Sequence, residues 1–168
     1  MNIVLPSPRL IFFLLAATCA AMIGVGLIMQ YVFDMEPCPL CITQRVFIIA
    51  VGVISLIAGF HNPPTLWRRI YGGAGVVAAM IGGGVSARHV WIQNLPEDQV
   101  PTCGPGLSYM FETLPMFDAL SLLFAGDGNC ADEVFNFIGL SIPGWTLVAF
   151  IGLACICVWQ IFRPNSNT

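Results

Sequence analysis

Two pairs of cysteines carry the most reactive side chains of this sequence. Cys38 and Cys41 enclose Pro39 and Leu40 in a C-x-x-C motif, while Cys103 and Cys130 are separated by residues 104–129. A cysteine thiolate attacks disulfides, donates electrons to electrophiles and binds soft metals. The two pairs therefore indicate either thiol–disulfide chemistry or a metal site.

The position of the C-x-x-C motif favours a reactive thiolate. Pro39 suits the first turn of a helix, and the free N–H groups and positive dipole end of such a turn stabilise an anion. A zinc site formed by all four cysteines is an alternative, and an inert disulfide is another. Zinc prefers four ligands, and His61 and His89 are the histidines of the chain.

The second pair, Cys103 and Cys130, is surrounded by residues that favour turns. A disulfide between them would stabilise the fold by about 3 to 4 kcal/mol if its role were structural. Proline and glycine around Cys103, and glycine, aspartate and asparagine before Cys130, instead favour an exposed backbone that can receive a thiol of another protein. Both interpretations stay open from the residues alone.

Three cationic or titratable residues accompany the cysteines. Arg45 lies four residues after Cys41, so the two share a helix face. Its guanidinium could stabilise a thiolate or donate hydrogen bonds to a carbonyl oxygen of an acceptor. Arg88 and His89 lie together in another apolar segment, where His89 could carry protons. Anchoring at the membrane interface is the alternative for all three.

These residues must be positioned by membrane helices. Hydrophobic residues make up 57% of the chain and charged residues 9%, which is typical of a membrane protein. Four apolar segments are long enough to cross a bilayer, at about residues 10–32, 42–60, 70–90 and 144–162. The sequence predicts an all-α four-transmembrane-helix bundle, a single domain over residues 1–168. The first segment is too long for a cleaved signal peptide.

Charge predicts the orientation of the bundle. Arg9, the pair Arg68 and Arg69, and Arg163 alternate with segments that hold all acidic residues. Because arginine and lysine gather on the cytoplasmic side, both termini are expected in the cytoplasm. A short loop at about 31–41 and a long loop at about 92–143 then face the periplasm. The net charge of −3 offers no basic surface for nucleic acid.

The two outward loops contain Cys38, Cys41, Cys103 and Cys130, and an exported compartment favours disulfides. Cys19, Cys155 and Cys157 fall within spans, where cysteine usually packs as a small apolar residue. The long loop also has two apolar runs, Leu107 to Phe124 and Val134 to Ile142. We expect them to be interfacial helical segments that hold the loop near the membrane.

Together these residues resemble the bacterial disulfide bond formation protein family DsbB, over nearly the whole chain. The matching residues are Cys38, Pro39, Leu40, Cys41, Ile42, Arg45, Cys103, Gly128, Asn129, Cys130, Ala131, Phe137, Ile138, Gly139, Leu140, Pro143 and Trp145.

The resemblance implies an inner-membrane thiol oxidase. Cys103 would form the mixed disulfide with a DsbA-like periplasmic thiol oxidase, and Cys130 would resolve it. Cys41 would face ubiquinone or menaquinone, with Arg45 on the quinone side. His89 lies near the position of the family's quinone-associated histidine, and Arg88 is beside it.

Three other functions stay open at this point, and one of them is a structural four-span scaffold with inert disulfides. A vitamin K epoxide reductase-like enzyme also joins a C-x-x-C motif to a quinone. A membrane metal-handling protein would use the cysteines as ligands, and its metal content would distinguish it.

Overall fold

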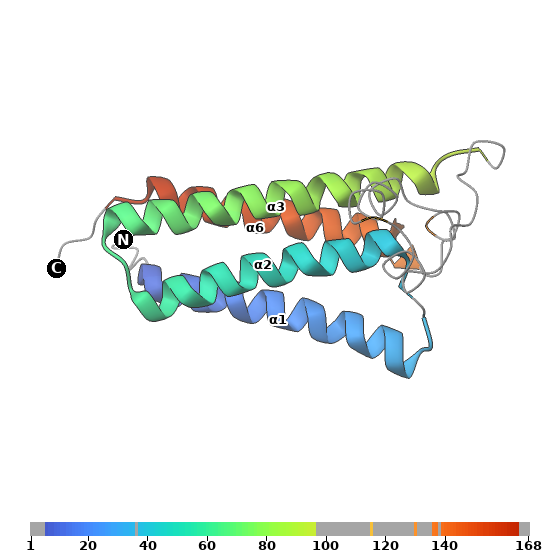
Figure 1. Cartoon of the computed structure of the whole chain (residues 1–168), viewed down its shortest axis with the longest axis horizontal. Coiled ribbons are helices and arrows are strands. Elements are labelled where there is room, and N and C mark those ends of the chain that lie inside the picture. The colour runs from blue at the N-terminus through green and yellow to red at the C-terminus, as the bar shows by residue number, and fades with distance from the viewer. Residues whose placement is uncertain are drawn as a thin grey trace.

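The computed structural model describes residues 6–35, 37–96, 115, 130, 136–137 and 139–164. Within them lie four long helices: α1 (Pro8–Val32), α2 (Pro39–His61), α3 (Thr65–Gln93) and α6 (Ile142–Phe162). All four are long and apolar enough to cross a membrane. They form an elongated bundle with both termini at one end (Figure 1). The predicted four-helix membrane fold is therefore confirmed.

Local sequence determines where the helices start and stop. The Ser7 side chain accepts a hydrogen bond from the Leu10 N–H at the start of α1. Asn62 ends α2 in the left-handed conformation, with φ 44°. Helix α6 begins at Ile142 and not near Gly144, because Pro143 is tolerated in a first turn, where no N–H is needed. Helix α3 likewise begins before residue 70.

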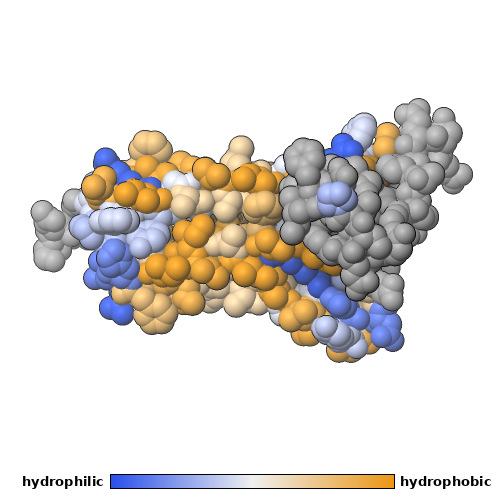
Figure 2. Space-filling model, viewed as in Figure 1, coloured by the Kyte–Doolittle hydropathy of each residue, from blue (hydrophilic) through white to orange (hydrophobic). Residues whose placement is uncertain are grey.

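The bundle buries a narrow core and exposes a broad apolar surface. Phe12, Val51, Ala79 and Phe150 are almost completely buried where the helices meet. Leucine, isoleucine, valine and phenylalanine side chains of all four helices point outward, and Figure 2 shows a hydrophobic belt across the middle of the face in view. Such an extended exposed apolar surface is what lipid contact requires.

Small residues bring α3 against α6. A Cβ added at Gly82 would lie 2.4 Å from Phe150 Cζ and 2.8 Å from Phe47 Cβ. At Gly75 the added atom would lie 2.8 Å from Cys157 Sγ. In membranes, where helices gain little from the hydrophobic effect, such close backbone approach supplies the packing.

This packing predicts that Gly82→Ala destabilises the bundle by about 1 to 3 kcal/mol, because the new methyl group overlaps two phenylalanines. Gly84→Ala is the matched control, since nothing lies within 4 Å of its Cβ position. Thermal unfolding of both variants in detergent measures the difference. Equal melting temperatures would contradict the close contact at Gly82.

The long loop is only partly described. The first apolar run, Leu107 to Phe124, lies outside the described residues except for Pro115. In the second run, strand β1 (Asn136–Phe137) pairs antiparallel with β2 (Leu140–Ser141). Gly139 has a φ of 77°, which allows the chain to reverse between them. The interfacial helix predicted for Val134 to Ile142 is therefore not confirmed, because its described part is a hairpin.

Candidate functional site

The C-x-x-C motif forms the N-terminus of α2, as its sequence predicts. Cys38 is the N-cap residue, and its Sγ accepts a hydrogen bond from the Cys41 N–H at 3.4 Å. Pro39 occupies the first turn. The sulfur of Cys38 thus takes the place of the usual oxygen cap, where free N–H groups and the helix dipole stabilise negative charge.

His89 of α3 lies between the cysteines. It is 3% exposed, and its Nε2 lies 3.7 Å from Cys38 Sγ and 3.2 Å from the carbonyl oxygen of Cys130. Its Nδ1 lies 4.0 Å from Cys41 Sγ and 3.2 Å from Gln44 Nε2. Because the carbonyl can only accept and the amide nitrogen can only donate, these partners favour the neutral tautomer with its proton on Nε2.

Cys130, which belongs to the connection between α3 and α6, lies beside Cys38 and His89. It is completely buried, and its Sγ, Cys38 Sγ and a ring nitrogen of His89 all lie within 4.8 Å of one another. Cys38 of the first predicted pair therefore lies beside Cys130 of the second. Cys103 lies outside the described residues.

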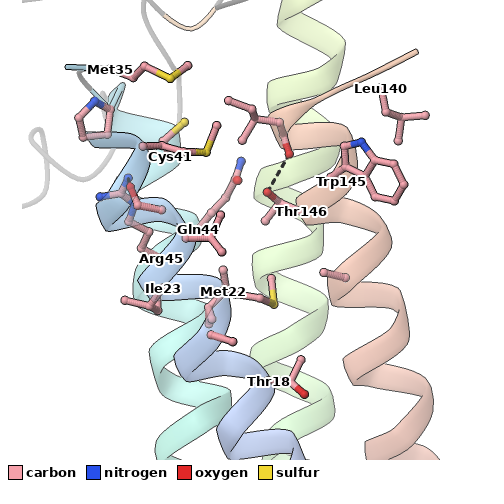
Figure 3. Close-up of a pocket in the computed structure, with 18 residues that line it drawn as sticks. Thr18, Met22, Ile23, Met35, Cys41, Gln44, Arg45, Leu140, Trp145 and Thr146 are labelled. Atoms are coloured by element: carbon pink, nitrogen blue, oxygen red, sulfur yellow. Dashed lines mark hydrogen bonds between the residues drawn. The ribbon is translucent and has the colours of Figure 1, made fainter. Parts of the chain in front are cut away.

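Beyond Cys41 lies a cavity of about 550 Å³ between α1, α2 and the start of α6. Its walls are mainly methionine, valine, isoleucine and alanine side chains, with a few polar groups. Figure 3 shows Cys41, Gln44 and Arg45 on the α2 side, across from Trp145 and Thr146 of α6. The cavity can hold a flat apolar molecule with one polar edge toward α2.

Arg45 is fixed between two helices. Its guanidinium donates to Gln30 Oε1 and, at 3.0 Å, to the Gly26 carbonyl oxygen, both on α1. Both acceptors are neutral, so the positive charge at the cavity wall is not cancelled by them. A guanidinium in an apolar wall favours an oxygen-bearing or anionic ligand.

The other two predicted cofactor-binding residues lie outside the cavity wall. Arg88 is exposed, with its guanidinium 5.6 Å from the centre of the Trp91 ring. His89 does not line the cavity but contacts Gln44 and Cys41, which do. Contact of Arg88 or His89 with a quinone stays a prediction.

Two glutamines belong to the site and were missed from the sequence. Gln44 is 3% exposed and joins His89 to the cavity, while Gln30 holds Arg45. A usable signal existed for Gln44, since a polar residue within an apolar helix and beside Arg45 indicates a buried hydrogen bond.

Comparisons with known proteins find relatives that match this chain over nearly its whole length. The family model described as "Disulfide bond formation protein DsbB" matches residues 8–160. A protein of Saccharophagus degradans named "Disulfide bond formation protein B" is 62% identical over 159 residues, covering 95% of this chain and 96% of the relative. One of Nitrosococcus oceani with the same name is 47% identical over 161 residues, covering 96% and 95%.

Proposed function

Because the chain belongs to the DsbB family of disulfide bond formation proteins, we propose that it oxidises a periplasmic DsbA-like dithiol protein and passes the electrons to a membrane quinone. One observation carries the quinone half of this proposal. Cys41 lies both in the C-x-x-C motif and in the wall of the apolar cavity that Arg45 faces. A dithiol that opens toward lipid needs an acceptor that is soluble in lipid.

The cavity fits a quinone by its chemistry. Its apolar walls suit the ring and the isoprenoid chain of ubiquinone or menaquinone, and Arg45 and Gln44 offer N–H donors for a carbonyl oxygen. Cys41, Gln44 and Arg45 are the residues that would hold the head group. A bound quinone would supply an acceptor for two electrons and two protons.

The contact between Cys38 and Cys130 supports a direct exchange between the two pairs. In the proposed reaction, the Cys130 thiolate attacks Cys38 of an oxidised Cys38–Cys41 disulfide, and Cys41 leaves as the thiolate. Cys103 then attacks Cys130, which restores the Cys103–Cys130 disulfide and releases Cys38. The separation of Cys38 and Cys130 requires only a small movement for the first step.

His89 is positioned to move the protons of this exchange. Its Nε2 lies beside Cys38 Sγ and the Cys130 backbone, and its Nδ1 lies beside Gln44. An imidazole can take a proton from a thiol and return it at neutral pH. With its proton on Nε2 beside Cys38, His89 can give that proton to the Cys38 sulfur and take one from Cys41 at Nδ1, while Gln44 orients the ring.

The fit of the cavity predicts that Arg45→Met raises the quinone KM by roughly tenfold, the effect of losing one charged hydrogen bond. Arg45→Lys should recover part of the loss, because it keeps the charge but not the planar fork of donors. The measurement is quinone reduction at saturating dithiol partner. Exchange between the partner and Cys103 should be unchanged in both variants.

Arg88→Met is the matched control, since it removes an arginine near the same end of the bundle that does not line the cavity. Its quinone KM should equal that of the wild type. A normal KM in Arg45→Met, or a raised KM in Arg88→Met alone, would move the quinone site away from the cavity.

Metal handling is the second candidate function. Cys38, His89 and Cys130 offer three ligand atoms within 4.8 Å of one another, and zinc accepts such sulfur and nitrogen ligands. Stoichiometric zinc in the purified protein, together with a lack of thiol oxidation, would favour this candidate. Membership of the DsbB family favours disulfide formation over this function and over a vitamin K epoxide reductase-like activity.

A further inference from the structure

Two buried arginines meet at the end of the bundle that holds the termini, opposite the cysteines. Arg68 in the first turn of α3 and Arg163 at the end of α6 are each only 4% exposed. The Arg68 guanidinium donates to the Arg163 carbonyl oxygen at 2.6 Å. Neither Arg68 Nε nor Arg163 NH1 has a hydrogen-bond partner among the described residues, although both atoms are buried. The two side chains thus offer N–H donors that lack acceptors.

The charges of this arginine pair also lack a counter-ion from the helices. All Asp and Glu residues of the chain lie at positions 34 and 36 or between positions 97 and 133, in the connections at the other end of the helices. Arg69 and Arg9 add further positive charge at the same end. Burying two guanidiniums beside each other is unfavourable unless an anion binds them, so the pair favours a bound anion.

Exposed apolar side chains lie at the same end of both helices. Leu66 and Ile70 are 68% and 48% exposed on the face of α3 opposite Arg68, and Phe162 on α6 is 77% exposed. The Arg163 guanidinium lies 5.2 Å from the centre of the Trp159 ring, which is itself 40% exposed. Figure 2 shows hydrophilic side chains at this end directly beside the hydrophobic belt. If the anion is the head group of a lipid, its acyl chains would lie along the hydrophobic belt.

We propose that Arg68 and Arg163 form a binding site for the phosphate group of an anionic phospholipid. The guanidinium fork matches the oxygens of a phosphate, and basic pockets between membrane helices commonly take such head groups. The acyl chains would lie against Trp159 and Phe162 of α6. This site is independent of the cysteines and goes beyond the proposed redox function.

The test is lipid retention by the full chain in detergent, measured by native mass spectrometry. Phosphatidylglycerol and phosphatidylcholine with identical acyl chains are compared for the wild type, Arg68→Gln, Arg163→Gln and the control Arg69→Gln. Arg69 is the neighbouring exposed arginine and carries the same charge. We expect the wild type and Arg69→Gln to retain phosphatidylglycerol in preference to phosphatidylcholine, and Arg68→Gln and Arg163→Gln to bind it roughly fivefold to tenfold more weakly.

A second measurement uses the wild type alone, so its result does not depend on whether a variant folds. Phosphatidylglycerol should raise the melting temperature of the wild type more than phosphatidylcholine does. Equal effects of the two lipids on the wild type would overturn the proposal, as would equal losses in Arg69→Gln and Arg68→Gln. Inorganic phosphate is added in a parallel series. If it stabilises the wild type as well as the lipid does and displaces it, the site binds a free anion and the lipid assignment is wrong.

Discussion

Cys38→Ser and Cys41→Ser are each expected to abolish quinone reduction. Cys41 lines the cavity, and in the proposed relay it delivers electrons there while Cys38 closes the disulfide with it. A serine hydroxyl can neither form a disulfide nor act as a comparable nucleophile at neutral pH. The rate of quinone reduction by purified protein, with a reduced dithiol partner in excess, measures the loss.

The cysteines within the spans supply the controls. Cys19 and Cys157 are buried in the packed core, and Cys155 is exposed on the outer face of α6. None of the three lines the cavity. Their alanine variants should turn over at the wild-type rate. Full activity in Cys41→Ser would show that the C-x-x-C motif does not carry the electrons.

The second large effect is expected in Cys130→Ser. Without Cys130, the partner should accumulate in a mixed disulfide with Cys103, because no resolving thiol remains to release it, and turnover should stop. The buried position of Cys130 beside Cys38 and His89 supports its role as the internal member of the pair. Non-reducing electrophoresis after mixing with the oxidised partner shows the adduct, because the free Cys103 thiolate attacks the disulfide of the partner and releases one of its thiols.

The matched control is Cys103→Ser combined with Cys130→Ser, which should form no adduct. An adduct between the partner and Cys38 in Cys130→Ser would reverse the assignment of the two pairs. The C-x-x-C motif would then be the docking pair.

Features of the site that depend on local sequence could be predicted. The Cys38 cap and Pro39 determine the start of α2, and the spacing of four residues places Arg45 below Cys41 on one helix face. Apolar length alone identifies four spans, because a bilayer sets a minimum length for a helix. These inferences use interactions within one helix or with lipid.

Contacts between distant segments could not be predicted in the same way. Cys38 and His89 are on different helices, and Cys130 approaches them from the connection between α3 and α6. Packing of α1, α2 and α6 creates the cavity, and no periodicity reveals it. Arg68 was expected in a loop, but α3 begins at Thr65 and places it in a buried first turn. Such positions follow from helix packing, which a single sequence does not specify.

The most direct test of the electron relay is the stoichiometry of quinone reduction by the purified chain in detergent. A reduced DsbA-like protein is added with ubiquinone or menaquinone, and free thiols and quinone absorbance are followed together. The relay predicts that each dithiol oxidised reduces one quinone, since both reactions transfer two electrons. Thiol oxidation without loss of quinone, or no oxidation in a protein that carries stoichiometric zinc, would contradict it.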